Sequence, residues 1–234
     1  MRDIWEEQLK WVESGEPFVL ARVVHTWRSA PRKSGAGMLI GKGMRVAGSV
    51  SGGCIEGAVI EEALDALENG ESRRLSFGVE DELALSVGLS CGGEVSVLLE
   101  KHWAFSSDPN TRKVWETLKN CIKNNNPAVL ISPLPAETGP STEEHDLLLI
   151  LPDGENVGVM QNNYEEAVAL AGEAYKEREN RIVELGGKEC FIQVFPRRDQ
   201  LVIIGAGHIT IPLVRFAKEL DFHTIVIDPR SVFA

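Results

Sequence analysis

The sequence lacks the features that mark membrane, secreted and nucleic-acid-binding proteins. None of its apolar runs approaches the roughly 18 residues that a membrane-spanning helix needs, so no membrane association is expected. Basic residues are outnumbered, with 24 Lys and Arg against 35 Asp and Glu in 234 residues. The resulting net charge of −11 argues against nucleic acid as a partner, because such binding needs a basic surface.

Cysteine is also scarce. Its four positions, Cys54, Cys91, Cys121 and Cys190, lie far apart, and none forms a C-x-x-C pair. This spacing argues against a disulfide framework and a structural zinc site, and it favours a reducing, cytoplasmic location. Residues 1–7 are polar and acidic, unlike a signal peptide.

The order of apolar segments predicts an α/β protein with two domains. Residues 1–198 are expected to form an N-terminal α/β domain, and residues 199–234 to begin a Rossmann-like, NAD(P)-binding type of domain. Within the first domain, residues of about 17–100 and 127–195 form a tandem β-rich pseudo-repeat. Such a repeat would allow the two copies to pack against each other.

The pseudo-repeat has an offset of 110 residues. It aligns Gly48 with Gly158 and Glu56 with Glu166. In each copy, an apolar strand and a hairpin precede a helix. The predicted elements of the first copy are a strand at 18–27, a hairpin over 38–47, a helix at 55–67, and strands at 75–77 and 94–100.

The most informative segment is the run Gly-Ser-Val-Ser-Gly-Gly-Cys-Ile-Glu-Gly at residues 48–57. Glycines allow positive φ angles, and the N–H groups of a helix start favour an anion. The run therefore predicts a phosphate-sized pocket formed by Ser51, Gly52 and Gly53. The helix dipole would favour the thiolate of Cys54 at its edge. The alternative is a tight turn with a small buried cysteine.

The second copy supports a functional interpretation of this turn. It has Gly-Val-Met-Gln-Asn-Asn at 158–163 and lacks the cysteine, so the turn with Cys54 is expected to bind something. Nearby, Arg28, Arg32 and Lys33 could pair with a phosphate, or could simply form a solvated loop. Cys91, next to two glycines, is a second candidate thiol.

Residues 199–234 have the pattern of a dinucleotide-binding strand–helix–strand unit. An apolar strand leads into Gly205, Gly207 and His208, and a second strand ends at Asp228, where an acid could accept a ribose hydroxyl. Thr210 stands where the pattern has its third glycine. A complete domain of this type would need about 100 further residues.

Together these motifs resemble the XdhC/CoxI family, the accessory proteins of xanthine dehydrogenase and related molybdenum hydroxylases. The resemblance is carried by Ser-Ala-Pro-Arg at 29–32, by the run at 48–57, by Cys-Gly-Gly at 91–93 and by the start of the Rossmann-like unit. It implies a chaperone that binds molybdenum cofactor (molybdopterin) and assists its sulfuration and insertion into the enzyme.

The resemblance also implies partners and site residues. The implied partners are an apo-xanthine dehydrogenase or related hydroxylase and a cysteine desulfurase. The exposed half-sheet at the C-terminal end further suggests a homodimer. We expect Cys54 or Cys91 to contact the molybdenum. The full set of expected cofactor contacts is Arg32, Ser51, Gly52, Gly53, Cys54, Cys91, Gly205, Gly207, His208 and Asp228.

Two other functions fit parts of the sequence. An NAD(P)-dependent oxidoreductase would use the Rossmann-like unit around Gly205 and Asp228, although no catalytic Tyr–Lys or His–Asp pair is recognisable. A thiol enzyme would use Cys54 as nucleophile, although the sequence offers no obvious paired base. A non-enzymatic chaperone accounts for more of the motifs than either.

Overall fold

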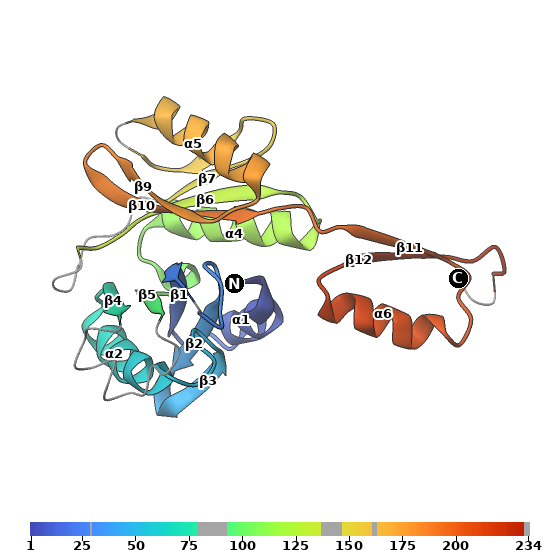
Figure 1. The fold of residues 1–234 in the computed structure, drawn as a ribbon, viewed down its shortest axis with the longest axis horizontal. Coiled ribbons are helices and arrows are strands. Elements are labelled where there is room, and N and C mark those ends of the chain that lie inside the picture. Colours follow the sequence, from blue (N-terminus) through green and yellow to red (C-terminus); the bar gives the residue numbers. More distant parts are fainter. Residues whose placement is uncertain (29, 79–92, 137–146, 161–162, 232–234) are drawn as a thin grey trace.

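The computed structural model describes residues 1–28, 30–78, 93–136, 147–160 and 163–231 (Figure 1). Its first sheet has five antiparallel strands in the order β3-β2-β1-β5-β4. These are β1 (Phe18–Trp27), β2 (Gly37–Gly41), β3 (Arg45–Gly48), β4 (Arg73–Phe77) and β5 (Glu94–Lys101). Helix α2 (Glu56–Asn69) covers one face, where Val19, Ala21 and Val23 alternate toward it.

A second five-stranded sheet repeats this topology, with the order β8-β7-β6-β10-β9. Its strands are β6 (Ala128–Pro133), β7 (Leu148–Ile150), β8 (Asn156–Gly158), β9 (Arg181–Leu185) and β10 (Lys188–Phe195). Helix α5 (Tyr164–Glu177) covers its outer face as α2 does in the first copy. The α/β fold with a tandem β-rich repeat is therefore present.

The shared core lies between the two sheets. Phe18 and Leu20 of the first copy meet Ala128 and Leu130 of the second copy, their counterparts 110 residues later, in one hydrophobic cluster. The cluster is completed by η1 (Arg2–Ile4), α1 (Trp5–Glu13), η3 (Trp103–Phe105) and α4 (Pro109–Lys123). Within the first sheet, η2 (Lys42–Met44) links β2 to β3.

A buried arginine joins the two sheets at their centre. Arg22 of β1 has a completely buried side chain, and its guanidinium lies 2.6 Å from Oε1 of Glu100 on β5. It also donates to Ser132 Oγ (3.0 Å) and Gln193 Oε1 (3.1 Å) of the second sheet. The other carboxylate oxygen of Glu100 accepts from Trp103 Nε1 at 2.9 Å. Each charge is thus paired and hydrogen-bonded, as burial requires.

His102 lies fully buried beside this core, with its ring 4.6 Å from Phe18 and 4.5 Å from Trp115. Burial lowers the pKa of His102 to about 3. Its Nδ1 accepts the Ala104 N–H at 3.2 Å, and the Gln8 amide lies 2.8 Å from Nε2. The imidazole is therefore neutral in the folded protein at neutral pH.

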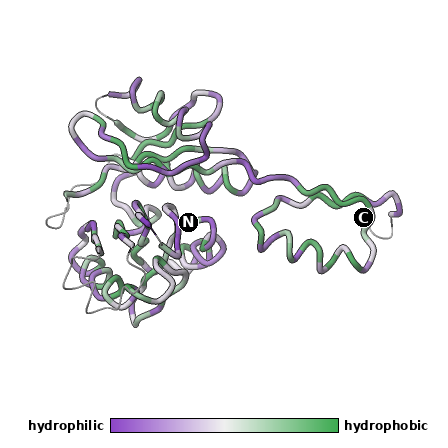
Figure 2. Tube along the Cα trace, viewed as in Figure 1, coloured by the Kyte–Doolittle hydropathy of each residue, from purple (hydrophilic) through white to green (hydrophobic). Residues whose placement is uncertain are grey.

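The chain ends in a smaller unit of two parallel strands and one helix. We call β11 (Gln200–Ile204), α6 (Thr210–Glu219) and β12 (His223–Ile227) the C-terminal unit. Figure 2 shows hydrophobic residues running through all three elements. Several are exposed, among them Ile204, Ile209, Phe216 and Leu220. Among the described residues, no helix is both long and apolar enough to cross a bilayer.

Replacing Arg22 by Leu should strongly destabilise the protein, because it leaves the Glu100 carboxylate buried without its cation. We expect a loss of about 3–5 kcal/mol in the free energy of unfolding, measured by urea denaturation. The double variant Arg22→Leu/Glu100→Leu should recover much of this loss. Arg73→Leu, which removes surface ion pairs with Glu62 and Asp65, should cost about 1 kcal/mol or less. If Arg22→Leu and Arg73→Leu lower the free energy of unfolding by similar amounts, the Arg22–Glu100 pair does not have the central role that we give it.

His102 should make the protein less stable as the pH falls below about 6.5. Below that pH the unfolded chain binds a proton at His102, whereas the folded protein binds it only near pH 3. This difference lowers the free energy of unfolding by up to about 1.4 kcal/mol per pH unit. Chemical denaturation of His102→Asn between pH 7 and 5 should therefore give a flatter profile than wild type. The control His25→Asn, at an exposed histidine, should keep the wild-type dependence of the unfolding free energy on pH. If His102→Asn keeps that dependence as well, His102 is not its source.

Candidate functional site

The turn between β3 and α2 binds a carboxylate from its own chain. Glu56, the first residue of α2, directs its side chain back into the turn, where it accepts four backbone N–H groups and two serine hydroxyls. The donors are Val50 N (3.2 Å), Ser51 N (2.9 Å), Gly52 N (3.1 Å), Gly53 N (2.9 Å), Ser49 Oγ (2.6 Å) and Ser51 Oγ (2.5 Å).

This arrangement corrects the expectation that Ser51, Gly52 and Gly53 offer their N–H groups to a phosphate. The turn does form an anion-binding concavity, but the anion is the carboxylate of Glu56. Partial burial raises the pKa of Glu56, yet the hydrogen bonds from Ser49 and Ser51 outweigh it and lower the pKa to about 2. The carboxylate is therefore ionised at neutral pH.

Glycine makes this turn geometrically feasible. Gly52 and Gly53 have φ angles of 91° and 121°, which L side chains rarely adopt. At Gly48, a Cβ atom would lie 2.5 Å from the carbonyl oxygen of Gly37 on the neighbouring strand. Ser51 fixes the segment between the turn and α2, because its Oγ accepts the N–H groups of Cys54 (3.0 Å) and Ile55 (3.1 Å).

Cys54 is held at the edge of this turn. Its N–H is fixed by Ser51, and its half-buried side chain packs beside the hydrophobic cluster under α2, as do Ala30 and Ala36. The adjacent Gly53 is exposed, and apart from its two chain neighbours no described residue has an atom within 4 Å of where its Cβ would be. A ligand can therefore approach the backbone next to the thiol.

The predicted basic residues are partly engaged within the protein. Arg32 donates from Nε to Ser49 O at 3.2 Å and forms an ion pair with Asp3, so it ties the turn to the N-terminal segment. Arg28 has a left-handed backbone (φ 59°), and its guanidinium stacks 3.9 Å above the ring of Trp27. Lys33 is exposed.

Cys91 lies outside the described residues, so its predicted role stays a prediction. The strands that flank it end at Phe77 and begin at Glu94, and Glu94 pairs with Trp27 at the end of β1. β3 runs in the direction of β1, so the turn after Gly48 leaves the sheet toward this same end, although Gly48 lies level with Ala21 and not with Trp27. Both cysteine-bearing segments thus leave the first sheet toward one end.

The glycine loop of the C-terminal unit has the predicted strand–loop–helix–strand order. Asp228 reaches this loop, and its Oδ2 accepts the Ala206 N–H at 2.7 Å. Both of its oxygens also accept from the Arg230 guanidinium, at 2.9 and 2.8 Å. These bonds, from Arg230 first and then Ala206, lower the pKa of Asp228. Thr210, in place of the third glycine, donates its hydroxyl to Gly205 O at 2.7 Å.

The structure does not bring the two predicted sets of residues together. The C-terminal unit projects away from the first sheet and α2 (Figure 1). Gly205, Gly207 and His208 lie in its glycine loop and Asp228 follows β12, whereas Cys54 lies just before α2. In the described part of the chain, no group of three or more His, Cys, Asp or Glu side chains could hold a metal ion.

The role of Glu56 was not predicted from the sequence, although a signal for it was present. The repeat aligns Glu56 with Glu166, and Glu166 accepts a hydrogen bond from Asn163 Nδ2 at 2.9 Å just before α5. An acid recurring in the first turn of both helices fits a helix-start anion from within the chain.

Part of the sequence matches a known protein family. The model of the XdhC and CoxI family matches residues 11–78. The resemblance to this family is therefore confirmed. The matched part contains both the turn with Cys54 and the loop with Arg32.

Three relatives extend this result. A Bacillus subtilis (strain 168) protein, named as a probable xanthine dehydrogenase subunit, is 25% identical over 224 residues, which are 95% of this chain and 62% of the relative. Two Escherichia coli (strain K12) proteins are each 36% identical. The molybdenum cofactor insertion chaperone PaoD matches over 88 residues (38% of this chain, 27% of PaoD), and the uncharacterized protein YqeB over 100 residues (43% and 18%).

A solved structure shares the fold. The crystal structure of a protein described as a xanthine dehydrogenase from Bacillus halodurans superposes with a TM-score of 0.72 at 24% identity, covering 96% of this chain and 62% of that one. The chain thus spans less than two thirds of the length of each of these relatives.

Glu56→Gln should destabilise the protein at pH 7 by about 1–2 kcal/mol, because an amide cannot accept all six hydrogen bonds. The difference from wild type should shrink as the pH falls from about 4.5 toward 2, where the folded carboxylate protonates. Thermal denaturation can measure both effects. Glu166→Gln, at the equivalent place in the second copy, should cost less, and equal costs would refute the special role of Glu56.

Proposed function

We propose that this chain acts in the maturation of a molybdenum hydroxylase. In this proposal it is a chaperone that binds molybdenum cofactor, holds it during sulfuration and assists its insertion into xanthine dehydrogenase or a related enzyme. The observation that carries the proposal is the family match over residues 11–78, because this segment includes the turn that presents Cys54. The likeness to a molybdenum cofactor insertion chaperone supports it.

In this proposal the thiol of Cys54 has the central part in cofactor binding, and the geometry of the turn supports it. A half-buried Cys54 beside an open glycine offers a soft sulfur ligand to a molybdenum centre that approaches the turn. The backbone N–H groups of the turn already bind Glu56, so the phosphate of the cofactor needs a different partner. The exposed Lys33 and the Arg28 guanidinium, on the loop that follows β1, are the cations that we assign to it.

The proposed partners follow from the same role. The apo-hydroxylase would receive the cofactor, and a cysteine desulfurase would supply the sulfur. Cys91 would be a second thiol near the site, because its segment leaves the first sheet toward the same end as the segment of Cys54 does. A homodimer would cover part of the exposed apolar surface of the C-terminal unit.

The two alternative functions are less well supported by the geometry. A dinucleotide ribose would have to compete with Arg230 and Ala206 for both oxygens of Asp228. A thiol enzyme would need a base beside Cys54, and Glu56, the carboxylate at this turn, is ionised but has both oxygens engaged.

A titration with purified molybdenum cofactor tests the proposal. Wild type should bind near-stoichiometrically, and Cys54→Ser should weaken binding by about tenfold or more, which corresponds to about 1.4 kcal/mol. Cys190→Ala is the matched control. Burial raises the pKa of the Cys190 thiol to about 11, and its variant should bind like wild type. Cys91→Ser completes the series.

Bound pterin would be quantified after separation from free ligand. Absence of binding by wild type would refute the proposal for this chain. Binding by wild type with no loss in either Cys54→Ser or Cys91→Ser would refute the assignment of a thiol contact.

A further inference from the structure

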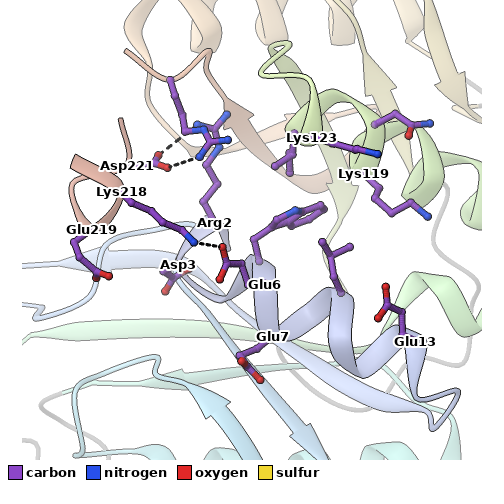
Figure 3. Close-up of a pocket in the computed structure, with 15 residues that line it drawn as sticks. Arg2, Asp3, Glu6, Glu7, Glu13, Lys119, Lys123, Lys218, Glu219 and Asp221 are labelled. Carbon is purple, nitrogen blue, oxygen red and sulfur yellow. Dashed lines mark hydrogen bonds and ion pairs between the residues drawn. The ribbon is translucent and has the colours of Figure 1, made fainter. Parts of the chain in front are cut away.

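The C-terminal unit is attached to the rest of the protein by charged groups. Lys218 of α6 lies 2.6 Å from Glu6 of α1, and Asp221 lies 3.4 Å from Arg2 (Figure 3). Arg198, in the segment that leads into β11, lies 3.8 Å from the same Asp221. In the described part of the chain, no residue of the C-terminal unit belongs to the hydrophobic clusters that hold the two sheets together.

The residues of these ion pairs line a cleft of about 1000 Å³. Its walls come from α1, the end of α4 and the end of α6, and Trp5, Leu9 and Ile122 give it an apolar part. Lys119 and Lys123 of α4 lie across the cleft from Glu13 of α1 (Figure 3). The cleft is as large as a typical small-molecule site, and the position of the C-terminal unit determines how open it is.

The ion pairs are the kind that salt weakens. The side chains of Lys218 and Glu6 are 64% and 66% exposed, and in the second pair Asp221 is 56% exposed and Arg2 18%. Exposed pairs contribute little each, and they are screened once the Debye length falls from about 10 Å at 0.1 M salt to about 3 Å at 1 M. An interface that rests on such pairs, and that adds no residue of the C-terminal unit to the described hydrophobic clusters, favours relative motion of the two parts.

The segment that connects the two parts is hydrogen-bonded to the N-terminal body up to Arg198. Asn125 accepts from Arg198 N at 2.7 Å and donates to Arg198 O at 3.3 Å, and Arg2 also donates to Pro196 O. The chain is therefore anchored to the N-terminal body as far as Arg198. Beyond it, Asp199 accepts from His223 N at 2.9 Å, which makes Asp199 part of the C-terminal unit. Asp199 keeps one further contact with the N-terminal body, an exposed ion pair with Arg178 at 3.6 Å, so the junction of Arg198 and Asp199 is where the firmly bonded segment ends.

We propose that Lys218–Glu6 and Arg2–Asp221 form an ionic latch. With the latch formed, the C-terminal unit closes the cleft beside α1 and α4. When the latch is broken, the unit swings about the junction of Arg198 and Asp199 and uncovers the half-buried Trp5 and Lys119. The inference is independent of the function proposed above, because it uses none of the residues around Cys54.

Charge reversal with small-angle X-ray scattering tests the latch. The radius of gyration of wild type should increase between 0.05 M and 1 M salt, because the Debye length falls from about 14 Å to about 3 Å over this range and the ion pairs are screened. Lys218→Glu should show the expanded value already at low salt, and the exchange Glu6→Lys/Lys218→Glu should restore the compact value. Lys10→Glu is the matched control, since Lys10 also lies 2.6 Å from a glutamate, Glu7, on the exposed surface of α1.

Trypsin cleavage at Arg198 supplies a second measurement on the same variants. The Arg198 side chain is only 27% exposed in the closed arrangement, so opening should accelerate cleavage several-fold in Lys218→Glu and leave Lys10→Glu unchanged. A radius of gyration independent of salt, with equal cleavage of Lys218→Glu and wild type, would overturn the proposal. So would an exchange variant as expanded as Lys218→Glu.

Discussion

The buried Arg22 network is the interaction on which the arrangement of this protein depends. The repeat offset places Ser132 at the position equivalent to Arg22, and the strand registers place Gln193 where the first copy has Glu100, since these residues pair with Leu130 and Leu20. Arg22 therefore binds its own glutamate and both counterparts in the other copy. A guanidinium can do this because its five N–H donors form a fixed planar fork.

The Arg22 network also supports the part of the fold that carries the candidate site. Arg22 joins β1 to β5 and to the second sheet, and β2 and β3 pair in turn beside β1, so the turn that follows β3 starts from a sheet that this network holds. The turn that presents Cys54 is then closed from within by Glu56 and Ser51, and Arg32 ties it to the N-terminal segment. The backbone around the thiol is thus fixed without a ligand, which is the condition for a preorganised site.

Much of this could be predicted from periodicity and repetition. The strand at 18–27 matches β1, and the hairpin, helix and repeat follow the apolar spacing, because each of these depends on local patterns. The occupant of the turn could not be predicted, since a glycine-rich helix start reads alike whether it binds a phosphate or a carboxylate from its own chain. Nor could Arg22 be recognised, because its partners lie 78 to 171 residues away.

A comparison of the two copies of the turn shows which of its residues the fold requires and which occur in one copy alone. Both keep a glycine with positive φ, at Gly48 and Gly158, where a Cβ would collide with a neighbouring backbone carbonyl. Both also have a glutamate in the first turn of the following helix, but Glu56 accepts the N–H groups of its turn, whereas Glu166 accepts from the Asn163 side chain. Cys54 has no counterpart in the second copy, and the fold therefore does not require it. That difference is why we assign the chemistry of the site to the thiol and the shape of the site to Glu56.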